Sequence, residues 1–293
     1  MDKDKPNKKE GEGTLLSRRD ALGILGGGLA LMAGPACNQP NTGPAVQQLS
    51  SVRALVFDAY GTLFNVQAVS ALAEQLVPGR GEVITQVWRL KQLEYTWLGS
   101  LMRGYEDFWA MTRYSLEFAL RAVGVQPTPE LVDQLRNRYL TLDPYPEALD
   151  ALRQLRQRGY KLAILSNGSP YMLDEATRAS GMDQLLDRII SVDLVQAYKP
   201  DPRVYALATD QLGVTSSQIL FVSSNNFDII GAKNAGLRAA WIRRAIPNPP
   251  PVGAPVSPSV LFSMLRGRQE EIGLDPDYSV NVLTDLPALV DSL

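Results

Sequence analysis

The sequence contains no histidine and a single cysteine, Cys37, among its 293 residues. Without histidine, the chain cannot form a Ser-His-Asp or Cys-His nucleophile system, an HExxH zinc site or a base built on imidazole. A single cysteine excludes an intramolecular disulfide and a metal site made of clustered cysteines. Any catalytic site must therefore use carboxylates, lysine, arginine, hydroxyl groups or a cofactor.

The chain also lacks an excess of charge of one sign. Its 29 Lys and Arg residues stand against 31 Asp and Glu residues, which gives a formal net charge of -2. No long basic run interrupts this balance, so the sequence carries no electrostatic sign of nucleic acid binding. Hydrophobic residues make up 45% of the chain, a share that favours a folded protein with one large domain and room for a smaller companion.

The first segment of the chain has the pattern of an export signal. Residues 21–36 carry no charge, but they are fewer than the roughly 20 apolar residues that a membrane-spanning helix needs. Arg18 and Arg19 precede this stretch and resemble the twin-arginine signal of exported bacterial proteins. We therefore expect residues 1–37 to be a twin-arginine-type signal peptide and the protein to be periplasmic.

Cys37 leaves the processing of this segment open. Gly34 and Ala36 are small residues that a signal peptidase accepts, and they stand directly before Cys37. Cys37 could instead be the acylated first residue of a lipoprotein, which would anchor the protein to a membrane lipid. A cytosolic protein with a weakly apolar tail is the third interpretation. In each case residues 38–50, rich in Pro, Gly, Gln and Asn, are expected to be a linker.

Short apolar runs alternate with helical patterns through most of the remaining chain. The apolar runs cover residues 52–57, 161–165, 188–192, 219–222 and 239–242, and the helical patterns cover residues 145–158, 170–180, 202–212 and 227–235. This alternation predicts βαβ crossovers, and hence an α/β fold with a Rossmann-like, doubly wound parallel sheet and helices on both of its faces.

Residues 66–140 break this alternation. Apolar residues recur there at helical spacing, among them Val87, Leu90 and Leu93, and no strand pattern interrupts them. We predict an inserted all-helical cap domain at residues 66–140 and an α/β core domain made of residues 51–65 and 141–293. The cap should cover the carboxyl ends of the strands, where open α/β sheets bind ligands. Towards the C-terminus, the pattern predicts a proline-rich loop at residues 246–258 and helices at residues 259–272 and 286–293.

Polar residues gather at the ends of the predicted strands. They are Asp58 and Thr62 after the first strand, Ser166 and Asn167 after the second, Lys199 ahead of the helix at residue 202, and Ser223, Asn225 and Asp228 after the fourth. Each residue alone could be a helix cap or part of a turn. Together, a carboxylate beside a lysine indicates a nucleophile that is kept ionised, and the hydroxyl and amide groups indicate an anionic substrate.

Four motifs, in order, resemble the haloacid dehalogenase superfamily. They are FDAYGTL at residues 57–63, LSNG at 165–168, YKPDPRVY at 198–205 and FVSSNNFD at 221–228. Within the predicted cap, WRLKQLEY at residues 88–95 and DFW at 107–109 are similar to the L-2-haloacid dehalogenase branch of that superfamily. The likeness covers about residues 52–245.

Tyr60 separates this sequence from the phosphatases of the superfamily. Phosphatases have a second aspartate at this position, which protonates the leaving alcohol, and they use Mg²⁺ to neutralise phosphate. The segment around Asn225 also lacks the additional carboxylate of many such metal sites. The resemblance therefore implies displacement at carbon with no metal and no cofactor. A phosphatase or phosphonate-cleaving hydrolase is the alternative on the same fold, and a non-catalytic exported binding protein is the alternative from another class.

The resemblance also implies a two-step mechanism. Asp58 attacks C2 of a short L-2-haloacid and expels halide with inversion, and water then hydrolyses the ester to release a D-2-hydroxy acid. Asp58, Lys199 and Asp228 are the implied catalytic residues. The residues implied to contact the substrate, or to support those contacts, are Thr62, Tyr60, Arg89, Leu93, Phe108, Ser166, Asn167, Tyr205, Ser223, Asn225 and Phe227.

Within this set, Arg89, Asn167 and Phe108 are implied to hold the leaving halide. Many relatives have tryptophan where this chain has Phe227, which predicts a pocket of different size or halide preference. The resemblance further implies a homodimer formed through the cap helices. The export signal departs from it, because enzymes of this branch are typically cytoplasmic.

Overall fold

A computed structural model describes residues 51–244 and 250–293 of the chain. The predicted signal peptide, which includes Cys37, and the predicted linker lie outside the described residues. Among the described helices, none is long and apolar enough to cross a membrane.

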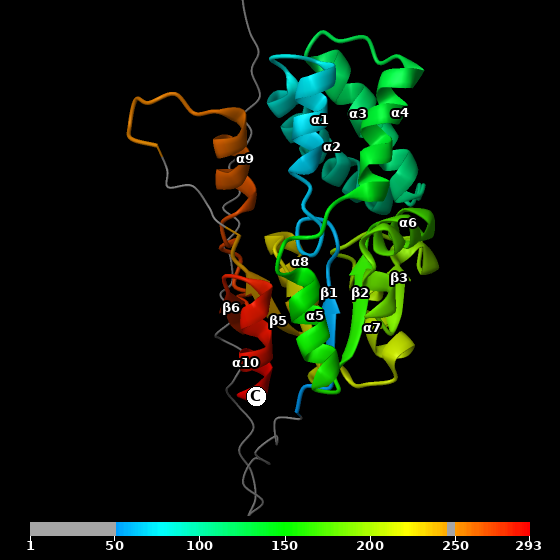
Figure 1. Ribbon diagram of the computed structural model, residues 1–293, viewed down its shortest axis with the longest axis vertical. Coiled ribbons are helices and arrows are strands. Elements are labelled where there is room, and N and C mark those ends of the chain that lie inside the picture. The colour runs from blue at the N-terminus through cyan, green and yellow to red at the C-terminus, as the bar shows by residue number, and fades with distance from the viewer. Residues whose placement is uncertain (1–50, 245–249) are drawn as a thin grey trace, which may run out of the picture. The chain divides into compact units, whose positions relative to one another are not determined.

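Six parallel strands form the central sheet (Figure 1). They are β1 (Ala54–Phe57), β2 (Lys161–Ser166), β3 (Arg188–Ser191), β4 (Ile219–Ser223), β5 (Arg238–Ile242) and β6 (Tyr278–Val280), in the spatial order β3-β2-β1-β4-β5-β6. All four residues of β1 are buried. A strand that is apolar on both faces suits the middle of a parallel sheet, which helices cover on both sides.

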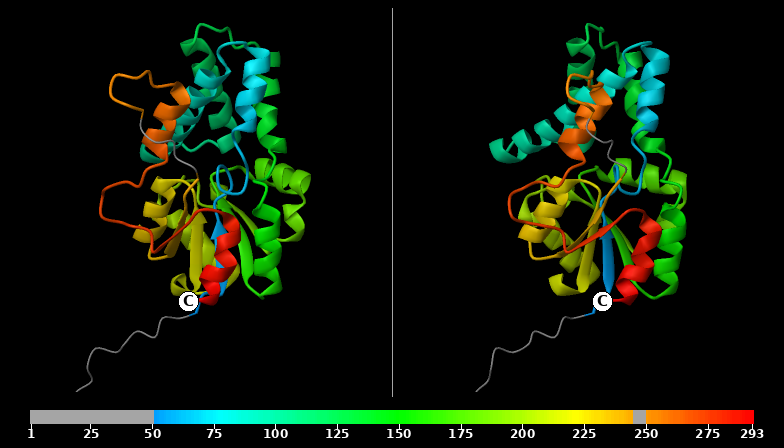
Figure 2. Two further views of the ribbon diagram at one scale, coloured as in Figure 1. Left: turned by 60° about the vertical axis from the view of Figure 1, so that its left-hand side comes forward. Right: turned by 90° about the vertical axis from the view of Figure 1, so that its left-hand side faces the viewer.

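Five helices belong to the sheet: α5 (Ala148–Gln157), α6 (Pro170–Ser180), α7 (Pro202–Leu212), α8 (Asn226–Asn234) and α10 (Leu286–Asp291). Helix α5 packs against α10, and α7 packs against α8. Figure 2 shows these two pairs on opposite faces of the sheet. The arrangement confirms the predicted doubly wound α/β fold.

Four consecutive helices lie beyond the carboxyl ends of the strands (Figure 1). They are α1 (Ala68–Leu76), α2 (Gly81–Met102), α3 (Phe108–Ala122) and α4 (Pro129–Asn137). Helix α2 packs against both α1 and α3. Between α2 and α3, the fully buried indole of Trp88 donates a hydrogen bond to the Thr112 carbonyl at 2.8 Å. The buried side of α2 includes Ile84, Trp88 and Leu93, whereas Leu90, which the sequence pattern placed on the apolar face, is 37% exposed.

The C-terminal part differs from the sequence prediction in two ways. Strand β6 was not predicted, because its three residues are too few to form a recognisable alternation. Helix α9 (Pro258–Arg266) ends six residues earlier than the predicted helix, at Gly267, whose N–H donates to the Ser263 carbonyl at 2.8 Å. Beyond Gly267 the chain turns back towards the sheet, where β6 pairs with β5.

The strand order places a crevice between β1 and β4. The chain proceeds from β1 to β2 and β3 on one side and returns to β4, β5 and β6 on the other, so the connections leave the sheet in opposite directions at this point. Gly61 allows the loop after β1 to turn here, since its φ of +90° is unfavourable for other residues. The ends of β1 and β4 therefore face a common space.

Candidate active site

Asp58 follows β1 directly and lies at the centre of a hydrogen-bond network. Its backbone N–H donates to the Val222 carbonyl at 2.9 Å, which joins the ends of β1 and β4. Its Oδ2 accepts from Thr62 Oγ1 at 3.0 Å and from Asn225 Nδ2 at 2.8 Å, and Ser223 Oγ lies 3.5 Å from the same oxygen. These donors fix the carboxylate in place and stabilise its negative charge.

Lys199 lies between two carboxylates. Its Nζ donates to Asp58 Oδ1 at 3.1 Å and to Asp228 Oδ2 at 2.8 Å. Burial alone would lower the pKa of Lys199, but the charges of Asp228 and Asp58 outweigh it and raise this pKa above its ordinary value. Lys199 is therefore charged at neutral pH and offsets part of the negative charge of the pair.

Asp228 is fully buried in the first turn of α8. Its Oδ1 accepts a hydrogen bond from the Tyr205 hydroxyl at 2.8 Å. Burial raises the pKa of Asp228 to about 6, although the charge of Lys199 acts in the opposite direction. A Cβ atom at Gly231 would lie 2.2 Å from the Tyr205 hydroxyl, so glycine at this position gives the phenol room to reach Asp228. Tyr205 thus positions Asp228, and Asp228 positions Lys199.

A cavity of about 20 Å³ opens beside Asp58. Core residues and cap residues close it together: Asp58, Tyr60, Ser166, Asn167, Lys199, Asn225 and Phe227 from the core, and Arg89, Leu93 and Phe108 from α2 and α3. We call this space the catalytic cavity. The cavity is small and is lined mostly by buried side chains, which strengthens the electrostatic interactions inside it.

A chain of buried polar groups positions Arg89 at this cavity. Arg89 Nη1 donates to Gln92 Oε1 at 2.6 Å, and Gln92 Nε2 donates to Thr112 Oγ1 at 2.7 Å. The Thr112 hydroxyl donates in turn to the Phe108 carbonyl at 2.6 Å. Arg89 and Phe108, which come from different cap helices, are therefore held in a fixed relation to each other.

Tyr60 stands two residues after Asp58 and packs among other aromatic rings. Its ring lies 6.2 Å from the ring of Phe108 and 5.7 Å from that of Tyr139, between centroids. Burial raises the pKa of Tyr60 above its ordinary value, so the phenol is neutral. Its buried hydroxyl has no hydrogen-bond partner among the described residues.

Ser166 and Asn167, at the end of β2, form the opposite wall. Ser166 Oγ accepts from the Gly168 N–H at 3.1 Å, which leaves its own O–H free to point at a ligand. Asn167 Oδ1 accepts from the Lys199 backbone N–H at 3.0 Å, so its amide NH₂ group remains a donor. Phe227 also lines the catalytic cavity.

The structure places three predicted residues behind the carboxylates. Thr62, Tyr205 and Ser223 were predicted to contact the substrate or to support such contacts. None of the three lines the catalytic cavity. Instead, Thr62 and Ser223 contact Asp58, and Tyr205 contacts Asp228. Their position fits the supporting role and holds the reacting groups in place.

Two arginines near the site were missed by the sequence analysis. Arg244 follows β5, pairs with Glu147, and donates through Nη2 to the Thr62 carbonyl at 2.6 Å. Arg266 ends α9, and its guanidinium carbon lies 5.3 Å from the centre of the Phe227 ring. Both come from the C-terminal part, where no strand-end pattern marked polar residues as members of a site.

Within the described ranges, no three His, Cys, Asp or Glu side chains gather into a group that could hold a metal ion.

The chain matches proteins of known activity over most of its length. The model of the haloacid dehalogenase-like hydrolases matches residues 52–236. The (S)-2-haloacid dehalogenase of Xanthobacter autotrophicus is 45% identical over 242 residues, which cover 82% of this chain and 95% of that relative. The (S)-2-haloacid dehalogenase of Pseudomonas sp. (strain YL) is 47% identical over 240 residues, which cover 82% of this chain and 94% of that relative.

A solved structure of a relative has a similar fold. The L-2-haloacid dehalogenase of Xanthobacter autotrophicus with chloropropionic acid covalently bound superposes with a TM-score of 0.78 at 43% identity, covering 83% of this chain and 99% of that one. With the parallel sheet and the site geometry, these matches establish that the chain belongs to the haloacid dehalogenase-like hydrolase family.

Proposed function

We propose that this protein hydrolyses short-chain L-2-haloacids to D-2-hydroxy acids and halide through an ester on Asp58. One observation carries the proposal: Asp58 is fixed by Lys199, Asn225 and Thr62 beside a small buried cavity, and Tyr60 stands where a phosphatase needs an acid. The relatives named as (S)-2-haloacid dehalogenases, at 45% and 47% identity, give the reaction its substrate class.

In the first step, a carboxylate oxygen of Asp58 forms a bond to C2 of the haloacid while the carbon–halogen bond breaks. The halide leaves with the bonding electron pair, and attack from the opposite side inverts C2. Neither a base for the nucleophile nor an acid for the leaving group is required, since a carboxylate carries no proton to remove and halide needs none. This explains how the site can work without histidine.

The leaving halide needs a cation and weak donors. Arg89 supplies the positive charge, and the amide of Asn167 and the positive edge of the Phe108 ring supply weaker contacts. The substrate carboxylate is left to the Ser166 hydroxyl and nearby backbone N–H groups. Leu93 and Phe227 enclose the alkyl group, which is short because the cavity is small.

In the second step, water attacks the carboxyl carbon of the Asp58 ester. The new C–O bond places the water oxygen in the Asp58 carboxylate, and the bond between the carboxyl carbon and the oxygen on C2 breaks. The 2-hydroxy acid leaves with that oxygen, which takes one proton of the water. The second proton passes to solvent. Lys199 stabilises the charge that develops on the ester oxygen, and Asp228 keeps Lys199 in contact with Asp58.

Chloride release from (S)-2-chloropropionate tests the proposal. The wild-type protein should release chloride equally with and without Mg²⁺, and Asp58→Asn should lower the rate by at least about 10³-fold, since it removes the nucleophile. Mass spectrometry of protein trapped during turnover should show a propionate ester on Asp58. Turnover of p-nitrophenyl phosphate, or equal chloride release by Asp58→Asn, would contradict the proposal.

We further propose that residues 1–37 direct export to the periplasm. Arg18 and Arg19 before the uncharged stretch 21–36 support this function. Replacing both arginines with lysine should retain the protein in the cytoplasm, whereas unchanged fractionation would contradict a twin-arginine signal. Partition of the mature protein into detergent, lost in Cys37→Ala, would establish a lipid anchor at that cysteine.

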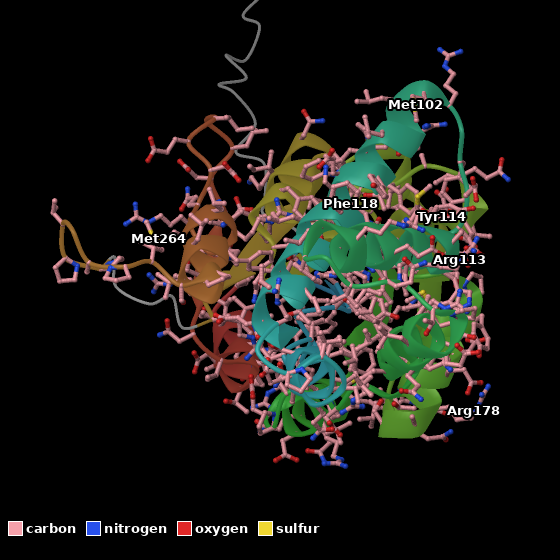
Figure 3. All side chains as sticks on the ribbon, turned by 90° about the horizontal axis from the view of Figure 1, so that it is seen from above. Met102, Arg113, Tyr114, Phe118, Arg178 and Met264 are labelled. Carbon is pink, nitrogen blue, oxygen red and sulfur yellow. The ribbon has the colours of Figure 1, made fainter. Side chains whose placement is uncertain are left out.

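A homodimer through the cap helices is a separate proposal. Apolar side chains are exposed at the end of α2, where Leu101 is 81% and Met102 is 69% exposed, and Phe118 on α3 is 38% exposed. Figure 3 shows Met102 and Phe118 on the cap, seen from above. Leu101→Asp with Met102→Asp should convert a dimer into a monomer in light scattering; a monomeric wild type would contradict the proposal.

A further inference from the structure

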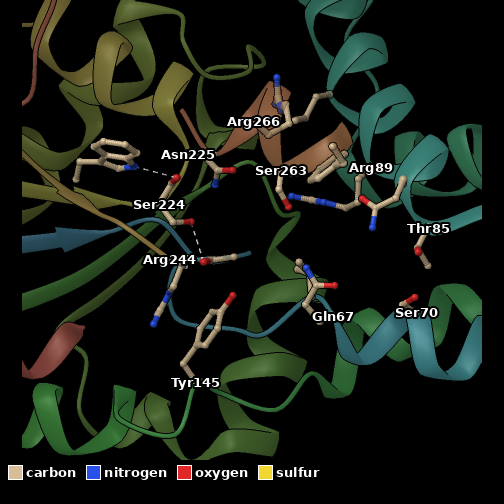
Figure 4. Close-up of a pocket in the computed structure, with 17 residues that line it drawn as sticks. Gln67, Ser70, Thr85, Arg89, Tyr145, Ser224, Asn225, Arg244, Ser263 and Arg266 are labelled. Carbon is tan, nitrogen blue, oxygen red and sulfur yellow. Dashed lines mark hydrogen bonds between the residues drawn. The ribbon is translucent and has the colours of Figure 1, made fainter. Parts of the chain in front are cut away.

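A second cavity adjoins the catalytic cavity. It has a volume of about 160 Å³ and lies between α1, α2, α9 and the segments that follow β4 and β5 (Figure 4). We call it the vestibule. It shares three lining residues with the catalytic cavity, namely Arg89, Leu93 and Asn225, so these side chains form the wall between the two spaces.

The vestibule carries positive charge without negative charge. Among the described residues that line it are the arginines Arg89, Arg244 and Arg266, and none of these described residues is an Asp or a Glu. Arg244 is neutralised by its ion pair with Glu147. Within the part of the chain that the structure describes, Arg89 and Arg266 have no ion-pair partner, and Arg89 contacts the neutral amide of Gln92. The charges of these two guanidinium groups are therefore left for another anion.

Arg266 is held in this position against an electrostatic cost. Its guanidinium carbon lies 5.6 Å from the ring centre of Trp97 and 5.3 Å from that of Phe227, and its buried Nη2 has no hydrogen-bond partner among the described residues. Burial, and then the like charge of Arg89, lowers the pKa of Arg266 to about 10, while Glu270 acts more weakly in the opposite direction. A bound anion between the two arginines would relieve this repulsion.

The size and lining of the vestibule favour a carboxylate over a halide. A planar guanidinium group can bind both oxygens of a carboxylate, and the Gln67 and Ser263 side chains, which Figure 4 shows at the vestibule, add neutral donors. Leu93 and Phe262 supply apolar surface for a short alkyl group. A single halide ion would leave most of the 160 Å³ unfilled.

We propose that the vestibule is an outer carboxylate-binding subsite, in which Arg89 and Arg266 hold a short-chain acid before it passes Leu93 into the catalytic cavity. The inference rests on the proposed function and deepens it, because it assigns a second binding position to the same class of substrate. Arg89 then serves both spaces, and Arg266 serves the outer one alone.

Calorimetric titration of the Asp58→Asn protein with (S)-2-chloropropionate tests the subsite, because this variant binds substrate without forming the ester. We expect two molecules per chain in Asp58→Asn and one in Asp58→Asn/Arg266→Gln. Asp58→Asn/Arg178→Gln is the charge-matched control and should bind two, since Arg178 is an exposed residue of the core helix α6, paired with Glu175. Figure 3 shows Arg178 far across the molecule from Met264 of α9. One molecule in all three proteins, or two in all three, would overturn the inference.

Filling the vestibule gives a second test that does not alter charge. Ser263→Leu places a larger side chain on α9 at the vestibule and should also reduce the count from two to one in the Asp58→Asn background. In chains with intact Asp58, Arg266→Gln and Ser263→Leu should raise KM by about threefold at low salt, with a smaller change in kcat, as expected when an attractive charge on the approach path is lost or blocked. Unchanged KM in both would count against the subsite.

Different results would contradict the proposed function and the proposed outer subsite. If the wild-type protein releases no chloride from any 2-haloacid, the proposed function is wrong. If it releases chloride while Asp58→Asn binds one molecule whatever residue occupies position 266, the function stands and only the outer subsite is wrong.

Discussion

The catalytic cavity and the vestibule share a wall but differ in how their charges are balanced. In the catalytic cavity, Lys199 contacts both Asp58 and Asp228, so the protein itself supplies the opposite charges. In the vestibule, Arg244 has such a partner, whereas Arg89 and Arg266 have none among residues 51–244 and 250–293. The charge of Lys199 is therefore used inside the protein to balance two carboxylates, whereas the charges of Arg89 and Arg266 remain available to a ligand.

This difference has an energetic basis. A buried charge is tolerated when an oppositely charged partner and hydrogen bonds replace the water that it loses. Removing one member of a buried ion pair therefore lowers protein stability more than removing both members. Substitution of a charged group that is paired within the protein should therefore lower the stability of the fold. Substitution of a charged group that has no such partner should affect ligand binding more than folding.

The largest effect should follow from Lys199→Met, which leaves two buried carboxylates without their counter-charge. We expect a loss of stability of about 3–5 kcal/mol and a loss of chloride release of at least about 10³-fold. Urea denaturation and chloride release measure the two quantities. A Lys199→Met protein that is as stable as the wild type and nearly as active would contradict the idea that the paired charges of the catalytic cavity maintain the fold.

The pH profile should give the next largest effect. Asp228 accepts hydrogen bonds from Lys199 as an ionised group, so activity should fall as the pH drops through the raised pKa of Asp228, about 6. Below that value the decrease should approach about tenfold per pH unit. The unfolded chain releases the Asp228 proton at a pKa of 3.8 and the folded chain at about 6. The free energy of unfolding should therefore fall as the pH rises between these two values.

Tyr205→Phe provides the matched control for this profile. The Tyr205 hydroxyl donates to Asp228 and so lowers the pKa of that carboxyl. Its removal should move the acid limb of the kcat profile to higher pH. If the acid limb of the kcat profile of Tyr205→Phe lies at the same pH as that of the wild type, the loss of activity at low pH is due to a group other than Asp228.

Arg244→Gln should have a smaller, structural effect. Arg244 pairs with Glu147, donates to the Thr62 carbonyl, and stacks on the Tyr145 ring at 3.5 Å from guanidinium carbon to ring centre. Loss of these contacts should reduce the free energy of unfolding by about 1–3 kcal/mol. Thermal denaturation measures this change.

Arg266→Gln should have the smallest effect on stability, with a lower cost than Arg244→Gln. The substitution removes stacking on Trp97 and Phe227, but it also removes the repulsion between Arg266 and Arg89. The same denaturation experiment compares it with Arg244→Gln. Equal losses for the two variants would remove the distinction between a structural arginine and one left for a ligand.

The sequence predicted the α/β sheet and the residues at its strand ends because both leave strong local patterns. The runs at β1, β2 and β4 are apolar and end abruptly in polar residues, and their alternation with helical patterns indicates parallel crossovers. The motifs then brought Asp58, Lys199 and Asp228 into one site, which the structure describes as a connected set of hydrogen bonds.

The vestibule could not be predicted in the same way. Its arginines come from α2, from the end of β5 and from α9, and no repeated spacing connects these positions. The packing of α9 on α2 depends on the chain after Ile242, where β6 is only three residues long. Contacts between surface helices leave little signal in a single sequence, so this part of the site required the three-dimensional arrangement.

The hydrogen bond between Lys199 and Asp58 joins residues 141 positions apart, and that between Asn225 and Asp58 joins residues 167 positions apart. These separations have a consequence for biosynthesis. Contacts of such long range form late, because the chain between them must first be ordered. During translation Asp58 leaves the ribosome well before the groups that will balance it, and a chain released before β4 would carry the nucleophile without a site.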